Sequence, residues 1–149
     1  MVMKRKAFNF LLGLICLVTC SAGLLAQQKS KGEKVIAVKY IKGRTLGFEI
    51  GDYQHVSVRL TNGKRKSFFI LKPGLDYFLA VNKTSLLNLT YEIAEVNLPE
   101  NGLTRLERVV SATAGSVRYE DWWKQMRAKH TIEQLDDKYG PLVSKYQLN

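Results

Sequence analysis

Three residues within seven consecutive positions could take part in acid–base or metal chemistry: Glu49, Asp52 and His55. Carboxylates and imidazole are groups that proteins use as general acids, general bases and ligands of divalent metals. The Gly51-Asp52 step is equally typical of a turn in which the aspartate accepts hydrogen bonds from nearby backbone N–H groups. The stretch gives two hypotheses, a small divalent-metal-dependent hydrolytic site and a turn beside a surface histidine. The turn is the preferred one.

A second group of candidate residues comes from a predicted β-hairpin around Asn62-Gly63, whose flanking residues alternate between apolar and polar. Asn-Gly favours a two-residue type I′ turn, which places Arg59 opposite Lys66 and Ser57 opposite Phe68. On this register the predicted core face carries Val56, Val58, Leu60, Ser67, Phe69 and Leu71. The outward face carries His55, Ser57, Arg59, Lys66, Phe68 and Ile70.

The outward face of this hairpin is the candidate binding surface. Its predicted contact residues are Arg59, Lys66 and Phe68, with His55 and Tyr53 beside them. Cations on such a surface follow the charges of an anionic chain, while aromatic rings stack on its planar groups. The residues of this surface predict a non-enzymatic binding module for an anionic ligand, which would be a nucleic acid, an acidic glycan or an acidic protein surface. The alternative is a hairpin end kept solvated by lysines, with Phe68 covered by another element.

The rest of the sequence holds no complete catalytic or metal-binding motif. The two histidines are His55 and His130, and both cysteines precede residue 21, so a zinc site would need carboxylates for most of its ligands. A Gly-x-Ser-x-Gly elbow and a glycine-rich phosphate loop are absent. We therefore predict no metal, no cofactor and no catalytic residue beyond the three candidates above.

The first 26 residues have the three parts of an export signal. Lys4-Arg5-Lys6 is basic, the run from Phe8 to Val18 is apolar but too short to span a bilayer, and Ala26 is a suitable cleavage residue. Cleavage there predicts an exported protein, periplasmic or extracellular, with no transmembrane segment and no cysteine remaining.

A lipid anchor is the alternative for the same region. Leu17-Val18-Thr19-Cys20 resembles the bacterial lipobox, although Thr19 stands where glycine, alanine or serine is usual. The resemblance implies lipidation at Cys20 and an envelope protein with protein partners only.

The mature chain is basic. Of the 23 lysines and arginines, three leave with the signal, so 20 remain against 13 acidic residues, a net charge of +7. Such a charge attracts anionic lipid, glycan, nucleic acid or an acidic protein, and by itself it does not choose among them. Solubility alone is the other explanation, and the charge predicts no oligomeric state.

After a polar lead-in at residues 27–34, the apolar pattern predicts three strands, a short helix and two strands. The first strand begins at Val35 and contains Gly43 and Gly47, which are typical of a bulge or bend. The short helix covers residues 75–83 and is expected to end at Asn82.

A helical tail is expected after these strands. Trp122 and Trp123 are predicted to pack its first helix against the core rather than to form a contact surface. A capping box at Thr131 predicts the start of a second helix, which is expected to stop at Gly140-Pro141.

This order of elements resembles that of the OB-fold, a five-stranded barrel with its helix between strands three and four. The resemblance implies a mainly β fold with helices, a barrel at residues 35–114 and a helical cap at residues 115–149. It also implies a surface for oligonucleotides or oligosaccharides. Parts of the sequence, among them GFEIGDYQHV and DYFLAVNK, are similar to small exported bacterial proteins of an uncharacterised family, which implies no activity.

A narrower resemblance is carried by the Gly51-Asp52 step, which is similar to the first-strand acid of staphylococcal-nuclease-like OB-folds. In those enzymes carboxylates hold calcium and arginines stabilise the charge of the phosphate. This chain departs from them on the strand after the hairpin, where Ser67, Phe68 and Phe69 stand in place of an arginine.

Overall fold

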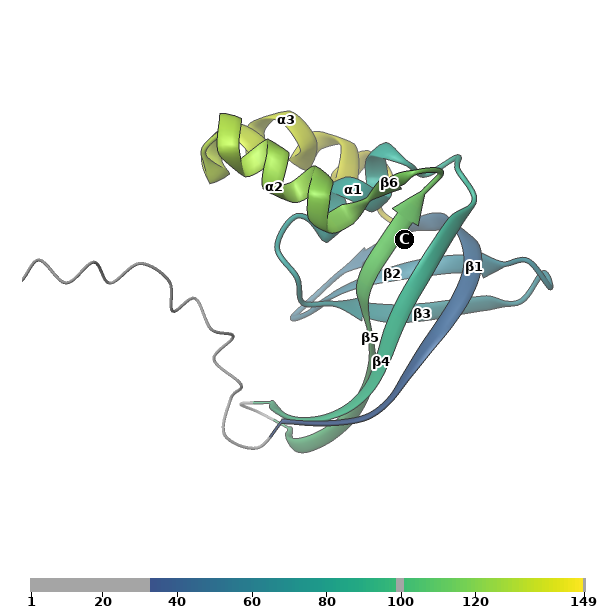
Figure 1. The fold of residues 1–149 in the computed structure, drawn as a ribbon. Coiled ribbons are helices and arrows are strands. Elements are labelled where there is room, and N and C mark those ends of the chain that lie inside the picture. The colour runs from purple at the N-terminus through teal and green to yellow at the C-terminus, as the bar shows by residue number, and fades with distance from the viewer. Residues whose placement is uncertain (1–32, 99–100, 149) are drawn as a thin grey trace, which may run out of the picture.

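The computed structural model describes residues 33–98 and 101–148 (Figure 1). The predicted signal peptide at residues 1–26, most of the lead-in and Cys20 lie outside these ranges. The described chain is mainly β with three helices. None of the described helices is long and apolar enough to cross a bilayer.

The elements follow the predicted order of three strands, a short helix, two strands and a helical tail, with one addition, a two-residue strand before the tail that the sequence did not predict. Their bounds are β1 (Lys34–Ile50), β2 (Gln54–Leu60), β3 (Arg65–Ile70), α1 (Leu75–Val81), β4 (Leu87–Leu98), β5 (Gly102–Ala114), β6 (Val117–Arg118), α2 (Tyr119–Lys129) and α3 (Ile132–Lys145). The short helix ends at Asn82 as expected.

All the strands belong to one sheet in the order β3-β2-β1-β4-β5-β6. Neighbouring strands in this order run antiparallel. A short parallel pairing of β3 with β5, at Phe69–Arg108 and Ile70–Val109, joins the two sides of the sheet. The β2–β3 hairpin therefore crosses the long strands β1, β4 and β5, as Figure 1 shows.

Strand β1 changes its pairing partner halfway along its length. Residues 34–43 pair with β4, and residues 43–50 pair with β2. The change occurs at Gly43, where an added Cβ would lie 2.5 Å from a side-chain carbon of Val58 and 2.7 Å from the carbonyl oxygen of Arg59. A register shift between Thr45 and Gly47 adds a bulge directly after it. The prediction of a long strand bent at glycines is confirmed.

The predicted register of the hairpin is wrong by one residue. The N–H of Gly63 donates to the carbonyl of Leu60 (2.9 Å), and the N–H of Leu60 donates to the carbonyl of Lys64 (2.8 Å), so the loop has three residues, not two. Gly63 has φ +82°, as expected for a turn that closes on a left-handed residue. Arg59 consequently faces Arg65 instead of Lys66.

This slip moves every side chain of β3 to the opposite face. Val56 pairs with Phe68 and Val58 with Lys66, so Phe68 enters the core and is 0% exposed. Ser67 and Phe69, which were predicted to face the core, lie on the other side. Phe69 packs there against a second, smaller apolar cluster of Ala94, Val96, Leu98 and Leu106.

The three helices form a layer over one end of the sheet (Figure 1). Trp122 lies 5.5 Å, between ring centroids, from Phe78 of α1, and the ring of Trp123 lies against Gly74, where an added Cβ would collide with it. Both tryptophans are partly buried against the core, as predicted. The helical layer does not cover the β2–β3 hairpin tip, which projects beyond β1.

The capping box at Thr131 is confirmed, but the predicted end of its helix is wrong. The Thr131 hydroxyl accepts from the backbone of Gln134, and the Gln134 side chain accepts from the backbone of Thr131. Helix α3 then continues through Pro141 to Lys145. Proline removes one helical hydrogen bond, but the following turn buries Val143 in the core, which offsets the loss.

The register can be tested with two neighbouring phenylalanines. Phe68→Ala should lower the free energy of unfolding by about 3–5 kcal/mol, because it leaves a cavity in the main core. Phe69→Ala should cost roughly 1–2 kcal/mol, since Phe69 is only partly buried. Urea unfolding of both variants is the measurement, and a larger loss for Phe69→Ala would contradict the observed register.

Candidate functional site

The residues predicted to share one binding face lie on two faces. His55 and Arg59 point outward from β2, whereas Lys66 and Phe68 of β3 point inward. Phe68 is fully buried, so its predicted role as an exposed stacking ring is wrong. The physical reason is the three-residue loop, which shifts β3 by one position relative to β2.

Lys66 has a structural environment inside the sheet. Its ammonium group forms an ion pair with Glu107 (2.8 Å), donates to the hydroxyl of Tyr91 (3.3 Å) and lies 4.6 Å from the centre of the Tyr91 ring. Burial lowers the pKa of Lys66, but its hydrogen bonds to Glu107 and Tyr91 and the charge of Glu107 outweigh this effect and leave the pKa raised. The lysine links β3 to β4 and β5.

Three arginines form a row across the outer face of β1, β2 and β3. Arg44 pairs with Arg59, and Arg59 pairs with Arg65, so the three side chains leave the same face of the sheet. Residues directly opposite each other in antiparallel strands have Cβ atoms about 5 Å apart. All three are exposed, and Arg44 also donates to the carbonyl of Thr84. We call this set the basic row.

Two members of the basic row were missed as site residues in the sequence. Arg65 is absent from the predicted contact residues because the predicted register places Lys66 opposite Arg59, and Arg44 is absent because nothing local shows which residue of β1 lies beside Arg59. Only the pairing of β1 with β2, between residues far apart in sequence, brings Arg44 there.

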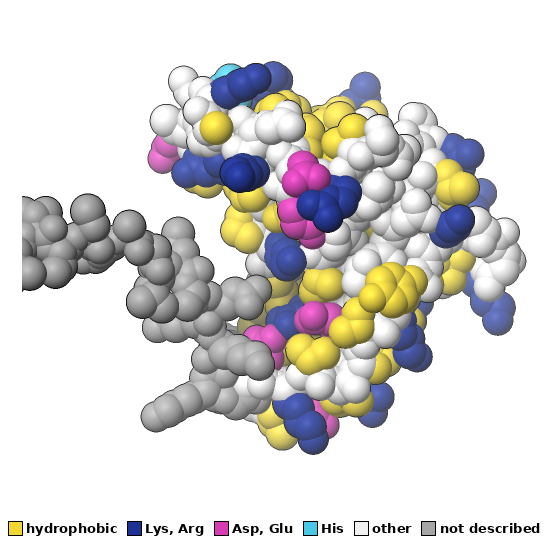
Figure 2. Space-filling view, viewed as in Figure 1, with side chains coloured by type: hydrophobic (Ala, Val, Ile, Leu, Met, Phe, Trp, Pro, Cys, Tyr) yellow, Lys and Arg dark blue, Asp and Glu magenta, His cyan; other side chains and the backbone are white. Residues whose placement is uncertain are grey.

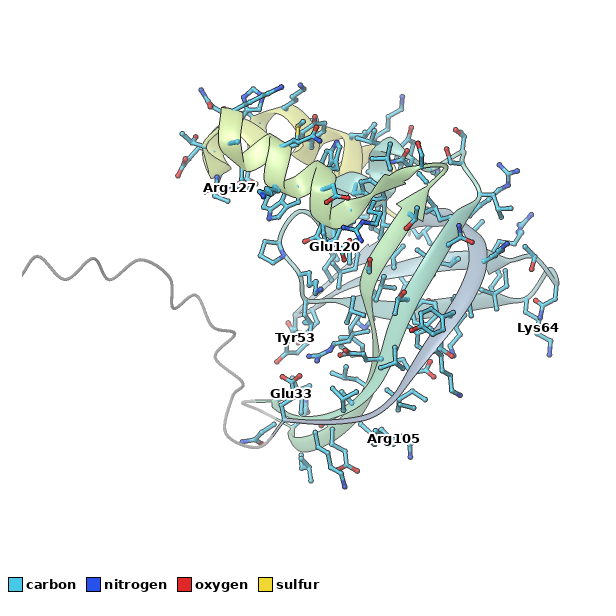
Figure 3. The ribbon with its side chains drawn as sticks, viewed as in Figure 1. Glu33, Tyr53, Lys64, Arg105, Glu120 and Arg127 are labelled. Carbon is cyan, nitrogen blue, oxygen red and sulfur yellow. The ribbon has the colours of Figure 1, made fainter. Side chains whose placement is uncertain are left out.

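An aromatic group occupies the opposite end of the hairpin. The centres of the His55 and Phe69 rings are 4.1 Å apart, and those of Tyr53 and Phe69 are 6.1 Å apart. Nδ1 of His55 lies 3.1 Å from the carbonyl oxygen of Tyr53. Figure 3 labels Tyr53 at this end and Lys64 at the projecting tip, so the two mark the two ends of the hairpin.

These rings line a cleft of about 440 Å³ together with Glu49 and Asp52. The first candidate residues of the sequence are thus neighbours on this surface. Glu49, however, accepts a hydrogen bond from the hydroxyl of Ser57 (3.0 Å). Within residues 33–98 and 101–148, no three His, Cys, Asp or Glu side chains are placed to hold a metal ion. The geometry gives no support to a metal site of Glu49, Asp52 and His55.

A second cleft, of about 310 Å³, lies between the end of β3, α1 and the helical tail. Asp76 lines it and accepts a hydrogen bond from the side chain of Gln54 (3.3 Å). Burial raises the pKa of Asp76 and the nearby charge of Asp136 adds to this, while hydrogen bonds from Gln54 and the backbone oppose it. Asp136 in turn accepts from the hydroxyl of Tyr77.

Comparison of the chain with protein families, curated proteins and solved structures finds no match. Function therefore has to follow from the side chains themselves. Of the surfaces described above, the basic row has the clearest chemistry, because it brings three like charges together in solvent.

The carboxylate of Asp76 gives a prediction about stability. Because its pKa in the folded state lies above the ordinary value of 3.8, its stabilising contribution is fully present below about pH 3.8 and is lost as the pH rises through the folded-state pKa. Asp76→Asn removes this titration and keeps an oxygen that can accept from Gln54. We expect the free energy of unfolding at pH 7 to rise by about 1 kcal/mol.

Urea unfolding at pH 7 and pH 4 checks this, with the exposed Asp137→Asn as the matched control. The gain from Asp76→Asn should shrink at the lower pH, whereas the control should change little at either pH. A loss of stability at pH 7 would show instead that the charged Asp76 stabilises the first turn of α1.

Proposed function

We propose that the protein is a non-enzymatic module that binds an extended polyanion on the outer face of β1, β2 and β3. The observation that carries the proposal is the basic row of Arg44, Arg59 and Arg65. Like charges directly opposite each other in a sheet destabilise it. An anionic ligand that bridges the guanidinium groups would reverse this cost.

The charge of the row is not neutralised within the described residues. There, the ion pairs join Lys66 to Glu107, Arg108 to Glu33 and Glu92, and Arg118 to Asp121. No carboxylate of this part of the chain lies within ion-pair distance of the basic row. Guanidinium groups are well suited to phosphate, sulfate and carboxylate oxygens, because their N–H groups can donate in parallel pairs.

The arrangement of the strands supports an OB-like barrel as the scaffold. Its pairings run β1-β2-β3-β5-β4 and return to β1, and α1 lies between β3 and β4 in the chain. OB-folds bind oligonucleotides and oligosaccharides on the face of strands two and three, between the loops that follow strands one and four. In this chain the same face carries Arg59 and Arg65, at the turn end of β2 and β3, whereas the loops after β1 and β4 lie at the other end, beside Tyr53.

The predicted export of the protein is consistent with such a ligand. The mature chain would carry a net charge of +7, which attracts anionic polymers at a distance and speeds their association. At the hairpin tip Lys64 adds a further cation (Figure 3).

The double variant Arg59→Ala plus Arg65→Ala tests the proposed function. Affinity for a single-stranded oligonucleotide and for a sulfated oligosaccharide should be measured by fluorescence anisotropy over a range of salt concentrations. Each phosphate contact with a single strand contributes about 0.7 to the slope of log K against log salt, so the slope should fall by about 1.4. At least one of the two polymers should bind the wild type and bind the variant more weakly.

The matched control is Arg105→Ala plus Arg127→Ala, which removes the same charge from positions away from the hairpin tip (Figure 3). If both double variants lose affinity equally, binding follows net charge and the basic row is not a site. If neither polymer binds the wild type in a salt-dependent manner, the proposed function is wrong.

The natural N-terminus tests the proposed export. Mass spectrometry of the protein purified from the membrane and soluble fractions of the cells that naturally produce it should show a chain that begins at Gln27. A chain that begins at a lipid-modified Cys20 would contradict cleavage after Ala26 and support the anchored alternative.

A further inference from the structure

A groove of about 550 Å³ lies beside the basic row, on the outer face of β1, β4 and β5. Its wall is the hairpin tip from Leu60 to Asn62, which projects across β1. The backbone N–H of Thr61 donates to the carbonyl of Lys42 (3.1 Å) and fixes the tip to the strand below it. The volume is in the range of sites for small ligands.

The floor of the groove follows from the strand register. Tyr40 of β1 pairs with Thr90 of β4, and Lys42 pairs with Asn88, which in turn pairs with Thr113 of β5. Opposite residues share a face, so the floor presents one aromatic ring, one ammonium group, one amide and three hydroxyl groups, of Tyr40, Thr90 and Thr113. In the part of the chain that the structure describes, no carboxylate lines this groove.

Tyr40 is the most exposed of the large apolar side chains described, at 79%. A tyrosine offers an apolar ring and a hydroxyl group at low cost in conformational entropy. Asn88 is exposed and Thr90 and Thr113 are partly exposed, so their side chains can be reached by a ligand. An exposed ring beside neutral donors and acceptors matches a sugar, which has an apolar C–H face and a rim of hydroxyl groups.

The groove and the basic row are continuous along β1. Tyr40, Lys42 and Arg44 are alternate residues on the same face, about 7 Å apart along the strand, and the register shifts of β1 lie outside this stretch. From Arg44 the line of cations turns across the sheet to Arg59 and Arg65. Figure 2 shows hydrophobic side chains over β4 and basic side chains at the edge where the hairpin projects.

We infer that the polyanion of the proposed function, on which this inference rests, is an acidic glycan. One sugar ring lies on Tyr40 between Asn88 and Thr90, and the acidic groups of the neighbouring sugars lie on Lys42 and the basic row. A single-stranded nucleic acid is the other polyanion. Its binding surfaces carry several rings for successive bases, whereas this groove has one ring and is otherwise lined by polar residues and three aliphatic residues, Ile41, Leu60 and Leu89.

Two variants separate the groove from the basic row. Tyr40→Ala and Asn88→Ala should each weaken binding of the exported protein to a sulfated octasaccharide by about fivefold or more, as expected for a contact at the centre of a site. Binding of a single-stranded oligonucleotide of matched charge should change by less than about twofold. Tyr40→Phe keeps the ring and should retain most of the glycan affinity.

Val38→Ala is the control, because Val38 is exposed on the same strand and does not line the groove. Thermal unfolding of each variant should match the wild type. Unchanged glycan affinity in both Tyr40→Ala and Asn88→Ala would overturn the inference, as would an equal loss of oligonucleotide binding. In either case, weaker polymer binding by the double variant Arg59→Ala plus Arg65→Ala would still support the proposed function. If neither polymer binds the wild type, the inference and the proposed function are both wrong.

Discussion

The change of partner in β1 at Gly43 is the constraint on which the rest of the structure depends. A single strand can pair with β4 through its first half and with β2 through its second half only if the hairpin passes close to it at the crossing point. Val58 and the backbone of Arg59 occupy the space where a side chain at residue 43 would stand. The second half of β1 then gains a further neighbour, since the N–H of Phe48 donates to the carbonyl of Tyr146 (3.0 Å) and closes the end of the chain onto the sheet.

The same crossing creates both surfaces that we associate with binding. It sets Arg44 beside Arg59, and it brings residues 60–62 of the hairpin tip to the side of the groove on β1, β4 and β5. Neither surface exists in the hairpin alone. The Lys66–Glu107 ion pair and the Arg108–Glu92 ion pair tie β3, β4 and β5 together, so these two cations are neutralised by carboxylates of the sheet, whereas the basic row has no carboxylate of the described residues within ion-pair distance.

Local sequence patterns predicted the main elements and their order, but not the register of the hairpin. The alternation of Val56 and Val58, the helix of Leu75, Phe78 and Leu79 and the capping box at Thr131 are short-range signals, and each element is present. Phe68 and Phe69 are adjacent and equally apolar, so alternation cannot decide which of them enters the core. The choice depends on Val56, across the hairpin, and on the parallel contact of β3 with β5, which no local pattern reveals.

The distribution of charge along the hairpin decides which direction an anionic chain would take. The end near Tyr53 carries Glu49 and Asp52, which repel it, and the Phe69 ring at that end is packed against Ala94 and Leu98. The other end carries the basic row and, along β1, Lys42. An anion bound by Arg59 is therefore attracted by the cations across β1 toward Tyr40 and repelled by the carboxylates along β2 toward Tyr53. Strand order alone suggests that the whole binding site is the face of β2 and β3. In this protein that face is one half of the proposed site, and the groove on β1, β4 and β5 beside the hairpin tip is the other half.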